Sequence, residues 1–176
     1  MSGVTSDTIG GFNKFLKDQK EEEGKATFTL YQFASGSIMV HNAIDIKEVE
    51  ELTNKNYIAD GHSTSLLDAV GKAINETGKR LREMSDKDRP AKVICVIQTD
   101  GQENSSHEFT WSAIQEMIKH QEEKYSWKFV FLGANLDAAK QADMMGIHVM
   151  NTLQYSNTGR GNAAAYNSVS KGMKKL

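Results

Sequence analysis

The sequence has only one cysteine, one proline, almost no net charge and no long hydrophobic run. Cys95 has no second cysteine to pair with, and its place inside the apolar stretch Val93–Ile97 indicates a core thiol in a reducing compartment. No apolar stretch approaches the roughly 20 residues that a membrane-spanning helix needs, and the start lacks a signal-peptide pattern. We therefore expect a cytoplasmic protein with no membrane partner.

The charge balance also limits the partners that this chain can attract. Lys and Arg number 21 against 23 Asp and Glu, so the formal net charge is -2 and no basic field is present to bind nucleic acid. A hydrophobic share of 39% is that of a soluble globular protein. The length of 176 residues predicts one domain, spanning residues 1–176.

Helical and strand patterns alternate along the chain. Helices are predicted at 6–20, 63–84, about 110–125, 137–146 and 162–176, and strands at 26–34, 37–41, 92–98, 128–135 and 147–151. Ser6 or Asp7 is expected to cap the first helix, and Ser65 with Asp68 is similar to a capping box. In the third helix, Trp111, Ile114, Met117, Ile118 and Tyr125 are expected to face inward.

The apolar cores of two strands predict the fold class. Val93–Ile97 and Phe129–Leu132 are continuously apolar, which indicates strands that are covered on both faces. The first two strands are expected to form an antiparallel hairpin. We therefore predict an α/β fold: a doubly wound, mostly parallel sheet with helices on both faces and one antiparallel edge strand.

Two polar residues are expected at the carboxyl ends of the strands. Asp100 directly follows the apolar strand, and Thr64 precedes the longest helix, so both would lie where ligands bind in open parallel sheets. Carboxylate and hydroxyl oxygens suit Mg²⁺ or Mn²⁺. The alternative is that Asp100 only forms a turn and Thr64 only caps a helix.

Four stretches resemble the von Willebrand factor type A (VWA) domain, in particular its bacterial and phage-borne kind: "IGGFNKFL", "GHSTSLLDAVGKAI", "VICVIQTDGQENSS" and "WKFVFLGAN". The resemblance covers essentially the whole chain. It implies a Rossmann-like fold and a metal-ion-dependent adhesion site (MIDAS), in which Thr64 and Asp100 would be metal ligands. In such domains an acidic side chain of a partner protein completes the shell of the ion. The resemblance therefore implies a protein-protein interaction module and not an enzyme.

The sequence departs from this family at its start. The central first strand and the DxSxS motif that supplies the rest of the metal ligands have no counterpart before Met1, so we expect a domain truncated at its N-terminus. Mg²⁺ or Mn²⁺ binding is then expected to be weak or absent. The strands that would flank the absent one have unpaired edges, which favours self-association. We consider three alternatives for the absent strand. An upstream segment supplies it, a strand arrives from another chain, or the sheet closes up and the metal site is lost.

Further candidate residues for contact with a partner lie next to Thr64 and Asp100 in the sequence. His62, Ser63, Glu103 and Asn104 are expected to line the surface that contacts the partner, although each is also an ordinary loop residue. Two other functions stay open. One is a small α/β hydrolase or phosphatase that uses Asp100 with Glu103 or His107, and the other is a metal-free scaffold subunit completed by a strand of its partner.

Overall fold

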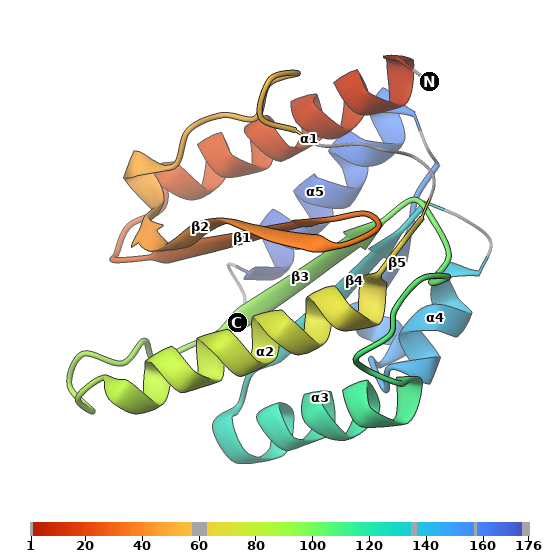
Figure 1. The fold of residues 1–176 in the computed structure, drawn as a ribbon. Helices are drawn as coiled ribbons and strands as arrows, with labels where there is room; N and C mark the ends of the chain where they lie inside the picture. Colours follow the sequence, from red (N-terminus) through yellow and green to blue (C-terminus); the bar gives the residue numbers. More distant parts are fainter. Residues whose placement is uncertain (1, 58–62, 135–136, 157, 174–176) are drawn as a thin grey trace.

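The computed structural model describes residues 2–57, 63–134, 137–156 and 158–173 (Figure 1). Its elements in chain order are α1 (Ser2–Lys20), β1 (Thr27–Phe33), β2 (Ser37–Asp45), η1 (Ile46–Glu48), α2 (Leu66–Glu83), β3 (Ile94–Thr99), α3 (Trp111–Tyr125), β4 (Lys128–Gly133), α4 (Ala138–Met144), η2 (Val149–Asn151), β5 (Thr152–Gln154) and α5 (Gly159–Met173). The predicted α/β class is confirmed.

The strands form two separate sheets. β1 and β2 pair as an antiparallel hairpin, and β3, β4 and β5 form a parallel sheet with β4 in the centre. The finer prediction, a doubly wound and mostly parallel sheet with one antiparallel edge strand, is therefore wrong. In the described part of the chain no strand pairs with both β1 and β3, so these two strands remain separate edges.

Helices cover both faces of the parallel sheet (Figure 1). Along β4, Phe129 and Phe131 join a buried cluster with α2, α3 and α4, whereas Leu132 joins a second cluster with α1 and α5. This division follows from the strand geometry, because successive side chains point to opposite faces. A strand that is continuously apolar from Phe129 to Leu132 therefore supplies both clusters.

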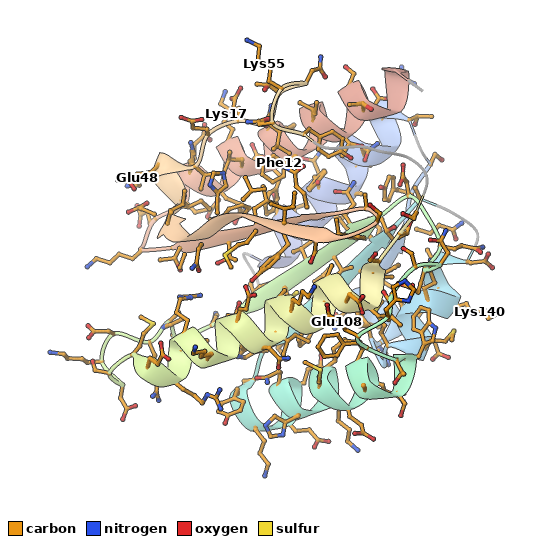
Figure 2. The ribbon with its side chains drawn as sticks, in the orientation of Figure 1. Phe12, Lys17, Glu48, Lys55, Glu108 and Lys140 are labelled. Carbon is orange, nitrogen blue, oxygen red and sulfur yellow. The ribbon has the colours of Figure 1, made fainter. Side chains whose placement is uncertain are left out.

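The hairpin packs between the same two layers. Figure 2 shows Phe12 pointing from α1 toward the hairpin, and its ring meets Phe28 of β1 edge-on with the centroids 6.0 Å apart. On the opposite face, Phe33 packs against the cluster of α2 and α3. β1 and the parallel sheet thus contribute to the same two hydrophobic clusters without sharing backbone hydrogen bonds.

Some local predictions are wrong. Ser6 and Asp7 lie inside α1 and do not cap it, because the helix begins at Ser2. Tyr125 is 59% exposed, since it lies in the last turn of α3, where its ring meets that of His120 edge-on. The predicted strand at 147–151 is in part the 3-10 turn η2, in which the His148 side chain accepts the Met150 N–H; β5 follows it.

Candidate docking site

The end of β3 is a tight turn that exposes Asp100. The Thr99 hydroxyl accepts the N–H of Gly101 at 3.1 Å and donates to its carbonyl at 3.0 Å. Thr99 is buried, whereas Asp100 between these two residues is exposed. The turn therefore holds the backbone of Asp100 in place and turns its carboxylate outward.

Thr64 lies against this turn. A Cβ placed on Gly101 would come within 2.6 Å of the Thr64 hydroxyl oxygen, so any larger residue at position 101 would require the Thr64 side chain to shift. The Thr64 N–H donates to the Asn104 side-chain oxygen at 2.8 Å, and the Asn104 N–H donates to the Thr64 carbonyl at 3.1 Å. The structure thus brings Thr64 and the turn containing Asp100 together, as the sequence predicts.

The Glu103 carboxylate holds the loop after β3 against the start of α2. It accepts the N–H groups of Leu67, Ser105 and Ser106 at 2.8–3.0 Å, and the Ser106 hydroxyl at 2.7 Å. The N–H groups of the first turn of a helix have no partner within the helix, so a carboxylate there is favourable. Glu103 therefore fixes the position of the loop from within the protein.

Asp68 holds the next part of the same loop. Its carboxylate accepts three backbone N–H groups, from His107, Glu108 and Phe109, at 2.9–3.0 Å. Burial opposes its ionisation, but these hydrogen bonds and the Lys72 ammonium outweigh the effect of burial and lower the pKa of Asp68.

The predicted capping box of Ser65 and Asp68 is wrong. Ser65 is the N-cap residue of α2 but makes no side-chain cap bond, because its hydroxyl contacts the Ser105 hydroxyl at 3.0 Å. Asp68 bonds the distant loop instead of the helix start. Both side chains therefore connect α2 to the loop after β3.

Asp100 also lies close to two phenols. Burial raises the pKa of Tyr57, and the Asp100 carboxylate raises it further. Burial likewise raises the pKa of Tyr155 to about 12, where a hydrogen bond from Gln98 lowers it and Asp100 raises it. The two phenols therefore stay neutral near pH 7.

A buried polar network lies behind this edge, and the sequence reasoning missed it. The Gln98 side-chain amide donates to the Tyr155 hydroxyl at 2.9 Å and to the Asn162 side-chain oxygen at 3.1 Å. The Tyr166 hydroxyl donates to the side-chain oxygen of Gln98. A glutamine at the end of an otherwise apolar strand was the available signal, since a buried amide requires partners.

The other predicted contact residues have different surroundings. Ser63 is half-buried beside Thr64, Asn104 is exposed, and the Glu103 carboxylate is turned to backbone N–H groups. His62 lies outside the described residues. That these four contact a partner stays a prediction.

The metal prediction gains no structural support. Across residues 2–57, 63–134, 137–156 and 158–173, the His, Cys, Asp and Glu side chains form no group of three or more that could hold a metal ion. Thr64 and Asp100 supply one hydroxyl and one carboxylate, a small donor set for Mg²⁺, which sheds its water reluctantly. The residues present therefore fit a resident ion poorly.

Comparison with known proteins does not assign a family. No protein-family model matches the chain, and no curated protein matches it. The resemblance to the VWA domain stays a prediction that rests on the sequence stretches quoted above. In the described ranges, no helix is both long and apolar enough to cross a membrane.

Proposed function

We propose that this chain is a protein-protein interaction module that binds its partner through the docking rim, defined as Ser63, Thr64 and Asp100. The observation that carries the proposal is the contact of the Thr64 hydroxyl with Gly101, next to Asp100. The reciprocal hydrogen bonds of Thr64 and Asn104 fix that contact. A rim held in this way loses little conformational entropy on binding, which favours recognition.

Three carboxylates near the rim support this assignment, because two of them bond to groups within the protein and the third does not. Asp68 and Glu103 accept backbone N–H groups and keep the loops in position. Asp100 is exposed, and no hydrogen bond to its carboxylate occurs within the described residues. Asp100 is therefore the carboxylate that is available to an external group.

The partner is proposed to be a protein, as the VWA resemblance implies. In that family a partner carboxylate binds at this edge, but it would repel Asp100 unless a cation lay between the two groups. One carboxylate and one hydroxyl give a cation little compensation for lost water, so we propose that dependence on Mg²⁺ or Mn²⁺ is weak or lost.

The rim is tested by comparing proteins retained by immobilised variants of the chain. The baits are the unmodified chain, Asp100→Asn, Thr64→Val and the control Asp143→Asn, in which an exposed carboxylate of α4 is removed. We expect a partner that the unmodified chain and Asp143→Asn retain and that Asp100→Asn and Thr64→Val lose. Unfolding midpoints confirm that the variants are folded. Identical retention by all four baits would refute the proposal.

Metal dependence is measured separately. Mg²⁺ and Mn²⁺ are titrated into the chain and into Asp100→Ala, with the heats recorded by calorimetry. We expect small heats that Asp100→Ala removes. Identical heats for the two proteins would exclude metal binding at Asp100 and would leave the docking proposal to the retention experiment.

A further inference from the structure

The turn after β3 contains an aspartate that is followed directly by a glycine, Asp100 and Gly101. The covalent chain places the Gly101 amide nitrogen so that it can attack the side-chain carboxyl carbon of Asp100 and close a succinimide ring. A side chain on the second residue crowds this attack, and glycine has none. The same pair occurs once more in the sequence, at Asp60 and Gly61, which lie outside the described residues.

The reaction needs no oxidant and no co-reactant besides water. A bond forms between the Gly101 nitrogen and Cγ of Asp100 in its carboxylic acid form, while the carboxyl hydroxyl leaves with the amide proton as water. Water then adds to the ring at either carbonyl carbon. Opening at Cγ restores aspartate. Opening at the main-chain carbonyl carbon of Asp100 gives isoaspartate, in which the chain runs through the former side chain.

The Asp100 carboxyl group is free to take part in this reaction. Asp100 is exposed, and within the described residues no hydrogen bond holds its carboxylate. The neighbouring carboxylates of Asp68 and Glu103 are bound by backbone N–H groups, which keep them in place. Of these three acidic residues, Asp100 is therefore the one whose side chain can rotate onto the following nitrogen.

The other reacting group, the Gly101 amide, is held by Thr99. Its N–H donates to the Thr99 hydroxyl at 3.1 Å, and the same hydroxyl donates to the Gly101 carbonyl at 3.0 Å. Thr99 is buried, and its own carbonyl accepts the Ala134 N–H at 3.0 Å. Attack on Asp100 requires the amide to lose its proton and to turn toward the carboxyl carbon. The hydrogen bond from the amide to Thr99 must therefore break first, which slows the reaction.

We propose that the Asp100–Gly101 bond is a site of spontaneous isomerisation to isoaspartate and that the Thr99 hydroxyl controls its rate in the folded chain. The exposed carboxyl group and the glycine make the pair reactive. The hydroxyl opposes the reaction by holding the amide. Thr99 acts only through Gly101, so it is a positioning residue.

Isoaspartate at position 100 would alter the docking rim. The main chain becomes longer by a methylene carbon, and the free carboxylate is then attached directly to Cα. Gly101 would move relative to the Thr64 hydroxyl, which lies close to it. This consequence rests on the proposed function, but the formation of isoaspartate does not, because it is measured without a partner. The two proposals therefore fail independently.

The test follows isoaspartate in the full chain during incubation at pH 7. Trypsin cuts after Lys and Arg and therefore places the two Asp–Gly pairs in separate peptides, 56–72 and 93–119. Isoaspartate leaves the mass of a peptide unchanged, but it changes the retention time in chromatography and blocks a protease that cuts before aspartate. The isoaspartate fraction of peptide 93–119 over time gives the rate at Asp100.

Thr99→Val removes the hydroxyl and keeps the branched shape of the buried side chain. It should raise the rate at Asp100 in the folded chain about fivefold, which corresponds to about 1 kcal/mol, the usual contribution of one hydrogen bond. Thr99→Ser keeps the hydroxyl and should retain the slow rate. In the matched control Asp100→Glu the charge is kept but ring closure needs a larger ring, so peptide 93–119 should stay unmodified.

Unfolding separates the effect of the turn from the chemistry of the pair. In urea, the unmodified chain and Thr99→Val should react at the same rate at Asp100, and both should react faster than the folded unmodified chain. The pair at Asp60 should then react at a similar rate, because both pairs are the same dipeptide. Unfolding midpoints show which variants are folded during the incubation without urea.

Four results would overturn the proposal. The first is no isoaspartate at Asp100 in the folded chain over a period in which the unfolded chain forms it. The second is an equal rate in the folded and unfolded unmodified chain, a comparison that needs no variant. The third is an unchanged rate in a folded Thr99→Val chain. The fourth is a rate in Thr99→Ser as fast as in Thr99→Val, which would assign the slow rate to packing of the methyl group.

Discussion

Asp68→Ala tests whether the loop after β3 is held by a buried carboxylate. The substitution removes the acceptor of three N–H groups, from His107, Glu108 and Phe109. Asp68 is 8% exposed, so its charge is retained in the interior by these bonds. The Phe109 ring also packs against α2 at Gly71, and a shift of the loop would disturb that contact.

The size of the effect follows from the bonds that are lost. A hydrogen bond to a charged group contributes about 1.5–3 kcal/mol, so three would reach roughly 5–9 kcal/mol if they were additive. Bonds to one acceptor are not additive, and water reaches the exposed His107 and Glu108 once the carboxylate is gone. We therefore expect Asp68→Ala to lower the free energy of unfolding by about 2–4 kcal/mol.

Urea unfolding measures this loss at pH 7. With a slope of about 2 kcal/mol per molar, the midpoint should fall by roughly 1–2 M. Asp143→Ala, which removes an exposed carboxylate, should stay within about 0.5 kcal/mol of the unmodified chain. A loss below about 0.5 kcal/mol for Asp68→Ala would refute the structural role of the three bonds.

The pH dependence gives an independent check. The pKa of Asp68 is lower in the folded chain than in the unfolded chain, so its stabilisation is complete above the unfolded value of about 3.9 and is lost as the pH falls through the folded value. The deficit of Asp68→Ala should therefore be constant from neutral pH to about pH 5 and shrink below about pH 4. A deficit that persists unchanged at lower pH would show that lost packing, and not lost charge, is responsible.

Two further predictions concern backbone space and thiol chemistry. Gly161→Ala should destabilise the chain by about 3 kcal/mol or more in urea unfolding, because its Cβ would lie 1.9 Å from the Ser156 carbonyl oxygen. Gly10→Ala in α1, where nothing lies within 4 Å, should instead stabilise it by about 0.5–1 kcal/mol; equal effects would contradict both assignments. Burial raises the pKa of Cys95 to about 12, so at pH 8 a thiol reagent should modify the folded chain roughly a thousandfold more slowly than the urea-unfolded chain, and comparable rates would exclude a core thiol.

The meeting of Thr64 with the turn after β3 could be predicted because it follows from chain order. A polar residue after an apolar strand and another before a helix lie at the carboxyl edge of a parallel sheet when the helix packs on that sheet in the usual right-handed way. The hydrogen bonds by which the Asp68 and Glu103 carboxylates hold the loop after β3 could not be predicted in the same way. Spacing suggested that Asp68 caps its own helix, but the carboxylate reaches N–H groups 39–41 residues further along the chain.

The sheet arrangement shows the same limit at a larger scale. Continuous apolar residues at β3 and β4 correctly predict strands with cover on both faces. Apolar content does not determine which neighbour a strand pairs with, because an edge is formed by backbone groups that every sequence carries. The resemblance to the VWA domain led us to expect unpaired edges at these two strands, with closure of the sheet as an alternative, and the structure leaves β1 and β3 in separate sheets.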